Sequence, residues 1–189
     1  MPPYFVEDPL YEQNFRRWAQ DGDVILASGA KSGTAWISQI VHVLKSGDDD
    51  YLKVGDRDEQ NEAIGTMEMV RYPGQTLEER VAEETARRAK VPPPMLWFSH
   101  KFPGGEGEKE RVGIDPRKNP KIKYILITRN GREIVKSFFP FINAHTDKFR
   151  QMWGGFPPKW TRKEEALEFT TTEQPQFYFG YVKAWWEYR

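Results

Sequence analysis

The chain has no cysteine, no excess of charge of either sign and no long apolar run. Without cysteine it cannot form disulfides or thiolate metal sites, and this composition fits a reducing compartment. Lysine plus arginine and aspartate plus glutamate both number 28, so we expect neither a nucleic acid nor a membrane as partner. The N-terminus, MPPYFVEDPLYEQNF, has no basic start and no continuous apolar stretch, so we expect a cytoplasmic protein.

The size of the chain suits one domain, and we expect residues 1–189 to form it around a single core. Aromatic residues make up 14% of the sequence and include seven tryptophans. Two interpretations of this content stay open, a large aromatic core and an aromatic-lined pocket for a ring-bearing ligand.

Two strand–loop–helix units predict the fold class. Residues 23–27 form a short apolar run, and apolar residues then recur at helical spacing over 34–45. The second unit begins with KYILIT at 123–128, a continuous run typical of a parallel strand covered on both faces. A helix marked by apolar residues over 134–142 follows it, and Pro140 is expected to end or kink that helix. We therefore predict an α/β domain with a P-loop-like parallel sheet flanked by helices.

The remaining segments are assigned more briefly. A third apolar run of strand length covers 95–99, after an exposed, highly charged helix at 77–89. An aromatic helix is predicted at 175–189. We expect 46–62 to be a solvated loop and 143–162 to be irregular.

The loop ASGAKSGTAW after the first strand has the residue types of an anion site. Gly29 and Gly33 permit close backbone approach, and the helix that follows presents N–H groups at the positive end of its dipole. Lys31 adds a full charge, and Ser32 and Thr34 add hydroxyl donors. The order differs from the triphosphatase loop G-x-x-x-x-G-K-[ST], because the lysine precedes the glycine. Phosphate or sulfate suits such a loop, although an ordinary strand–helix turn has the same pattern.

The second strand ends in Arg129, where a magnesium-dependent triphosphatase would place an aspartate. A guanidinium is suited to a second phosphate, and Ser137 lies about two helical turns further along. In isolation, the same two residues also fit a surface arginine and an ordinary helical serine. Together the two junctions predict a ligand with two separated phosphates and no metal.

Four segments in order resemble the cytosolic-type sulfotransferases. DVILASGAKSGTAW resembles a strand followed by T-Y-P-K-S-G-T-T-W, and KYILITRNGREIVKSFF resembles the strand followed by R-N-x-x-[DE]-x-x-x-S. LWFSHKFP resembles the stretch ending in T-H-L-P, and YFGYVKAWWEYR resembles the aromatic helix ending in W-W-E. The similarity runs from about Asp23 to Arg189.

The resemblance implies a fold, a reaction and a set of site residues. Members of the family transfer a sulfonate group from 3′-phosphoadenosine 5′-phosphosulfate (PAPS) to a hydroxyl or amine, without a metal. His100 would be the general base, and Lys31 would also stabilise charge on the leaving phosphate. Arg129 and Ser137 would hold the 3′-phosphate, with Trp36 stacked on adenine. The first loop would contribute Lys31, Ser32, Gly33, Thr34 and Ala35.

The acceptor in the resemblance is a small molecule held by apolar and aromatic side chains, so we expect a hydrophobic alcohol or phenol. The candidate lining residues are Trp97, Phe98, Phe102, Phe138 and Phe139. The two other histidines, His42 and His145, do not follow a strand, and we expect them to be structural or surface residues.

The chain departs from the family pattern near the loop and the base. Ser28-Gly29-Ala30 replaces the family's Thr-Tyr-Pro, so we expect less side-chain support for the segment that leads into the loop. Ala35 replaces a threonine, which removes one hydroxyl donor. Phe98 stands where many members carry a lysine, and one extra residue follows His100.

The chain also stops after W-W-E, before the family's next strand, its R-K-G-x-x-G-D-W-K segment and its dimerisation segment. We therefore expect the N-terminal two-thirds of the family domain, either as a fragment or as a shortened protein. Three hypotheses follow: a sulfotransferase, a degenerate module that binds a nucleotide or a partner, and, least favoured, a P-loop kinase or triphosphatase.

Overall fold

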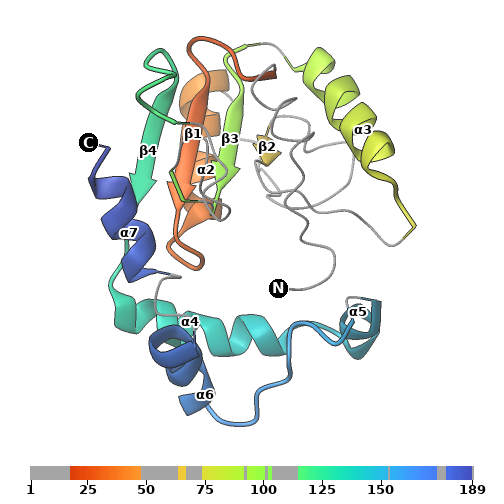
Figure 1. The fold of residues 1–189 in the computed structure, drawn as a ribbon, viewed down its shortest axis with the longest axis vertical. Helices are drawn as coiled ribbons and strands as arrows, with labels where there is room; N and C mark the ends of the chain where they lie inside the picture. Colours follow the sequence, from red (N-terminus) through yellow and green to blue (C-terminus); the bar gives the residue numbers. More distant parts are fainter. Residues whose placement is uncertain are drawn as a thin grey trace.

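A four-stranded parallel sheet with the strand order β2-β3-β1-β4 is the centre of the fold (Figure 1). The computed structural model describes residues 18–47, 64–66, 74–91, 93–100, 102–103, 115–152, 154–173 and 178–188. The strands are β1 (Val24–Ser28), β2 (Ile64–Thr66), β3 (Leu96–Ser99) and β4 (Lys123–Ile127). Because they are parallel, their carboxyl ends meet at one edge, with β1 between β3 and β4. The predicted α/β class is confirmed.

Helix α2 (Thr34–Ser46) covers one face of the sheet. Ile37 and Val41 pack from this helix against a buried cluster of strand residues. That cluster consists of Leu26, Leu96 and Ile127. The predicted helix at 34–45 is therefore confirmed, and it follows β1 through a five-residue loop at 29–33.

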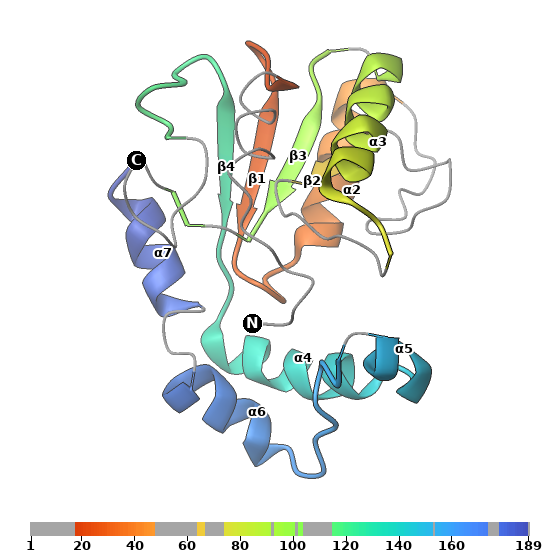
Figure 2. The same cartoon turned by 45° about the vertical axis from the view of Figure 1, so that its right-hand side comes forward.

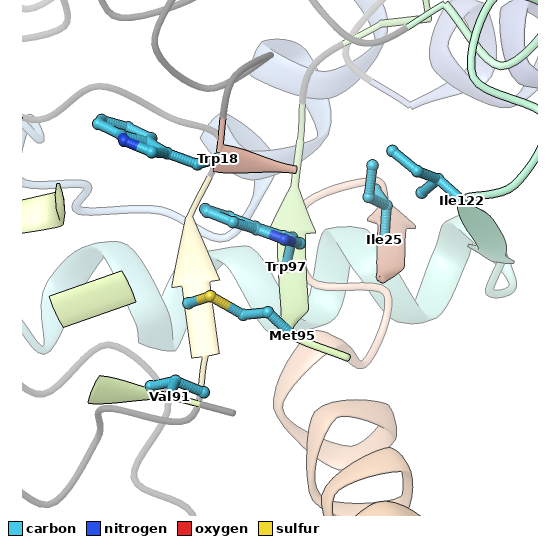
Figure 3. Close-up of a cluster of buried hydrophobic side chains, with 6 residues drawn as sticks. All are labelled: Trp18, Ile25, Val91, Met95, Trp97 and Ile122. Carbon is cyan, nitrogen blue, oxygen red and sulfur yellow. The ribbon is translucent and has the colours of Figure 1, made fainter. Parts of the chain in front are cut away.

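Helices α3 (Leu77–Lys90) and α7 (Phe179–Trp186) lie on the opposite face. From α3, Leu77 and Val81 pack on the core cluster drawn in Figure 3. From α7, Tyr181 and Trp185 pack on Ala27 of β1. The cluster of Figure 3 consists of Trp18, Ile25, Val91, Met95, Trp97 and Ile122.

The predicted exposure of the charged helix α3 is wrong for one of its faces. Arg80, Glu84 and Arg88 recur at helical spacing and are all buried. Arg80 pairs with Glu84 at 3.1 Å, and Arg88 lies 3.6 Å from the fully buried carboxylate of Asp23. Mutual pairing allows these charges to be buried, a possibility that charge density alone does not reveal.

Helix α4 (Gly131–Asn143) crosses the carboxyl ends of the strands in both views (Figures 1 and 2). Its buried residues Ile134, Phe138 and Ile142 pack with Ala166 of α6 (Glu164–Glu168). A π-helical turn, η2 (Phe169–Glu173), continues α6. Pro140 does not end α4, because the helix continues to Asn143.

The predicted irregular stretch 143–162 contains a further helix, α5 (Asp147–Met152). Buried Arg150 stabilises this region by donating to the carbonyls of Ile142, at 2.7 Å, and Pro157, at 2.9 Å, and also to that of His145. Such a short helix depends on tertiary hydrogen bonds, which explains why its sequence pattern is weak.

Some predicted segments lie outside the described residues. These are most of the loop at 46–62 and both ends of the aromatic helix predicted at 175–189. Among the helices that the structure describes, none has the length and apolar character needed to cross a membrane.

Candidate functional site

Three strand ends bring together the main residues expected to act in the site. Ser28 ends β1, His100 follows β3, and Arg129 lies two residues after β4. Because β1 pairs with both β3 and β4, these three positions lie at neighbouring points on the carboxyl edge of the sheet. Ligands of open parallel sheets bind at this edge, beside the central strand.

The loop between β1 and α2 has the backbone of an anion nest. Lys31 has φ 63°, an uncommon value for a residue with a side chain, and Gly33 has φ 112°. Gly33 is the N-cap of α2 and provides no side-chain cap, so the first-turn N–H groups of the helix are available to an anion. Ser32 is buried, and its hydroxyl has no hydrogen-bond partner among the described residues. A phosphate or sulfate oxygen would supply the partner that this hydroxyl lacks.

Two cations lie close to each other here, Lys31 within this loop and Arg129 in the loop after β4. The Arg129 guanidinium donates to the Lys31 carbonyl at 3.1 Å, which ties the loop after β4 to the loop after β1. Burial and, next, the charge of Arg129 lower the pKa of the Lys31 ammonium. That ammonium lies 4.1 Å from the centre of the Phe141 ring of α4. A bound anion would relieve the repulsion between the two cations.

His100 is oriented by the end of β1. Its Nδ1 donates to the Ser28 carbonyl at 2.7 Å, so the neutral ring carries its lone pair on Nε2. The Ser28 hydroxyl in turn pairs with the Thr34 hydroxyl at 2.6 Å. Ser28 therefore contacts both His100 and Thr34, the first residue of α2. The tautomer that it favours leaves the Nε2 of His100 suited to accepting a proton.

The other predicted nucleotide residues lie on α2 and α4. Trp36 is 78% exposed on the first turn of α2, and Ala35 beside it is also exposed. Ser137 is half-buried on α4, one turn before Phe141, whose ring contacts Lys31. The structure thus places Ser137 on the helix that faces the first loop.

The structure corrects two of the five predicted acceptor-lining residues. Trp97 is fully buried in the core of Figure 3, and its Nε1 donates to Asp23 at 3.0 Å. Phe138 is 3% exposed and packs between α4 and α6. Alternation along β3 and helical periodicity along α4 direct both side chains into cores. The remaining candidates, Phe98, Phe102 and Phe139, are half-buried, and the Phe98 ring centre lies 6.1 Å from that of His100.

Sequence reasoning missed Phe141 and Tyr178. Phe141 contacts the Lys31 ammonium and is 43% exposed. Tyr178 lies just before α7, and its hydroxyl accepts from the Arg129 N–H at 2.9 Å and donates to the Arg129 carbonyl. Its only sequence signal is membership of an aromatic segment, which does not indicate the residue that the hydroxyl contacts.

Comparison with known proteins shows which family the chain resembles. The sulfotransferase domain family matches residues 21–189, which is most of the chain. Sulfotransferase 1A1 of Rattus norvegicus is 27% identical over 191 residues, a match that covers 98% of this chain and 55% of the relative. Sulfotransferase 1B1 of Mus musculus is 27% identical over 177 residues, covering 89% of this chain and 49% of the relative.

A third relative, sulfotransferase 1 family member D1 of Mus musculus, is 26% identical over 196 residues, covering 96% of this chain and 56% of the relative. The chain thus spans about half the length of the curated relatives it matches. The resemblance drawn from the four sequence segments is confirmed, and the chain belongs to the sulfotransferase domain family.

Proposed function

We propose that this chain binds PAPS and transfers its sulfonate group to a hydroxyl or amine of a small hydrophobic acceptor in the cytoplasm. The observation that carries the proposal is the meeting of Lys31, Arg129 and His100 at three adjacent strand ends. Two cations and an anion nest suit a ligand with two anionic groups, and the neighbouring imidazole suits proton removal.

The residues present fit such a donor. Lys31, Ser32, Gly33, Thr34 and Ala35 would surround its 5′-phosphosulfate, because this loop offers N–H groups and an unpaired buried hydroxyl. Arg129 and Ser137 would hold the 3′-phosphate, and the exposed indole of Trp36 would stack on adenine. When bound, the donor supplies a sulfonate group activated by its bond to phosphate.

His100 and Lys31 would have complementary roles. The Nε2 of His100 would take the proton of the acceptor oxygen as that oxygen bonds to sulfur, since Nδ1 already donates to the Ser28 carbonyl. Lys31 would stabilise the negative charge left on the phosphate oxygen when its bond to sulfur breaks. Phe98, near His100, and the half-buried Phe102 and Phe139 would hold the apolar part of the acceptor.

A thermal-shift titration tests the nucleotide. Adenosine 3′,5′-bisphosphate at a hundredfold excess over its Kd should raise the Tm by about 5–10 °C. ATP with Mg²⁺ serves as the comparison, and Arg129→Ala should weaken binding of the bisphosphate. Stabilisation by ATP with Mg²⁺ alone would instead favour a phosphoryl-transfer enzyme.

A transfer assay tests the chemistry. His100→Ala should keep bisphosphate binding and lose sulfonate transfer to a panel of phenols. The matched control is His145→Ala, because His145 is also half-buried but lies between α4 and α5, with its Nδ1 3.2 Å from the Ile142 carbonyl. Bisphosphate binding without transfer in the unmutated chain would identify a non-catalytic nucleotide-binding module. Transfer that survives His100→Ala would refute the assigned base.

A further inference from the structure

Tyr178 contacts both loops of the proposed donor site although it lies far from them in the sequence. It is only 8% exposed and immediately precedes α7. Its ring faces the loop after β1, and its hydroxyl bonds to both main-chain polar groups of Arg129 in the loop after β4. One side chain therefore joins the two segments that carry the proposed anion-binding groups.

The ring of Tyr178 occupies the space that a side chain at position 29 would need. A Cβ added at Gly29 would lie 2.9 Å from Cδ2 of Tyr178 and 3.4 Å from its Cε2. The first of these distances is shorter than real Cβ contacts, so the loop and the ring fit closely only because residue 29 is glycine. The approach to the loop, which the sequence predicted to be poorly supported, is thus supported by a residue near α7.

The hydroxyl of Tyr178 forms hydrogen bonds with the main chain of Arg129. β4 ends at Ile127, so the sheet ladder does not hold the Arg129 peptide, and the tyrosine supplies both a donor and an acceptor to it. Phe179 adds packing where this loop enters α4, since a Cβ at Gly131 would lie 3.1 Å from its Cζ. The Arg129 guanidinium then reaches the Lys31 carbonyl at 3.1 Å, which closes a ring of contacts through both loops.

These contacts hold together two loops that carry cations of like charge. Lys31 and Arg129 repel each other, and the pKa of Lys31 is lowered by burial and, next, by the charge of Arg129. Other contacts must therefore hold the two cations at their separation, and Tyr178 makes uncharged contacts to both loops.

We propose that Tyr178 is a positioning residue that sets the separation of the two anion-binding loops, and that its hydroxyl makes the site selective for nucleotides with a 3′-phosphate. This inference rests on the proposed function. The ring supports the loop for the 5′ group, whereas the hydroxyl acts through Arg129 on the 3′ group.

Tyr178→Phe separates these two roles, because it keeps the ring and removes the hydroxyl. Titration calorimetry should show affinity for adenosine 3′,5′-bisphosphate falling about tenfold, the value of one to two hydrogen bonds. Affinity for adenosine 5′-monophosphate should fall by less than about twofold, because the first loop keeps its ring contact. Tyr124→Phe is the matched control, because the Tyr124 hydroxyl donates at 3.5 Å to the carbonyl of Asn119, a residue that precedes β4. Both affinities should stay unchanged in this variant.

A double-mutant cycle shows whether Tyr178 acts through Arg129. In an Arg129→Ala background, Tyr178→Phe should have no further effect on bisphosphate affinity. Gly29→Ala tests the ring contact without changing Tyr178, and it should lower the affinity for both nucleotides because it displaces the ring from the first loop. This second variant keeps the proposal testable if Tyr178→Phe does not fold.

Several results would overturn the role of Tyr178. The first is an equal loss of affinity for both nucleotides in Tyr178→Phe. The second is a loss of bisphosphate affinity from Tyr178→Phe that persists in the Arg129→Ala background. The third is that Gly29→Ala leaves both affinities unchanged. Failure of the unmutated chain to bind the bisphosphate is a different result, because it would refute the proposed function itself.

Discussion

Asp23→Ala should be among the most destabilising single substitutions in this protein. The Asp23 side chain is fully buried and accepts hydrogen bonds from the Met95 N–H at 2.6 Å, the Trp97 Nε1 at 3.0 Å and the Gln20 N–H at 3.0 Å. The guanidinium of buried Arg88 lies 3.6 Å away. These contacts join the start of β1 to β3 and α3, so one carboxylate connects three elements.

The expected magnitude follows from what the substitution leaves behind. Removing one partner of a buried ion pair costs about 3–5 kcal/mol, because the other charge stays buried. Each orphaned buried donor adds about 1–3 kcal/mol where no water reaches it. We therefore expect a loss of at least about 3 kcal/mol from a total stability of about 5–15 kcal/mol for an ordinary domain.

Urea denaturation measures this loss, with Asp21→Ala as the matched control. Asp21 lies two positions away and pairs with Lys121 at 2.7 Å, a shorter distance than in the buried pair, but both its side chain and that of Lys121 are about 70% exposed. Solvent screens such a pair, so its removal should leave the midpoint unchanged. The reasoning is refuted if Asp23→Ala costs less than about 1 kcal/mol or if Asp21→Ala is the more damaging change.

Three further predictions concern Lys31, its neighbour Phe141 on α4, and the buried Arg150 of α5. Because the pKa of Lys31 is lowered, a bound phosphate should raise this pKa again, so bisphosphate binding at alkaline pH should take up protons. Calorimetry in buffers of different ionisation enthalpy measures this uptake; it should vanish in Lys31→Arg, and its absence from the unmutated chain would contradict the prediction. Phe141→Leu should lower bisphosphate affinity about two- to fivefold by removing the ring beneath the Lys31 ammonium, whereas Phe156→Leu, at a similarly exposed phenylalanine, should not. Arg150→Met should lower stability by about 2–4 kcal/mol in denaturation experiments, because carbonyls that the buried guanidinium satisfies lose their donor. A change no larger than that of exposed Arg162→Met would refute that account.

The local elements could be predicted because their signals lie within a few residues. The apolar run before Gly29 predicts β1, and the periodicity after Gly33 predicts α2, since each pattern shows which side of an element is buried. The cationic loop could likewise be recognised from Lys31 and its glycines. The same reasoning allowed Pro140 to end or kink α4, and it does not end it, because this helix continues to Asn143.

The partner of each buried group could not be predicted, since it depends on contacts between distant segments. A period of two along β3 buries Trp97 but does not show that its indole bonds Asp23. Charge density on α3 predicted exposure, whereas Glu84 and Arg88 are buried beside opposite charges. Tyr178 carries no local sign that its hydroxyl holds Arg129.

By itself, therefore, the sequence determined the strand–loop–helix units, the residues available to bind anions and the family of the chain. The tertiary structure alone decided that β1 lies between β3 and β4, which brings Ser28, His100 and Arg129 to one edge. It also decided that Tyr178 fills the space beside Gly29 and bonds to the following loop. The physical reason is that patterning encodes how much of each element is buried, whereas strand order and side-chain packing decide which groups meet.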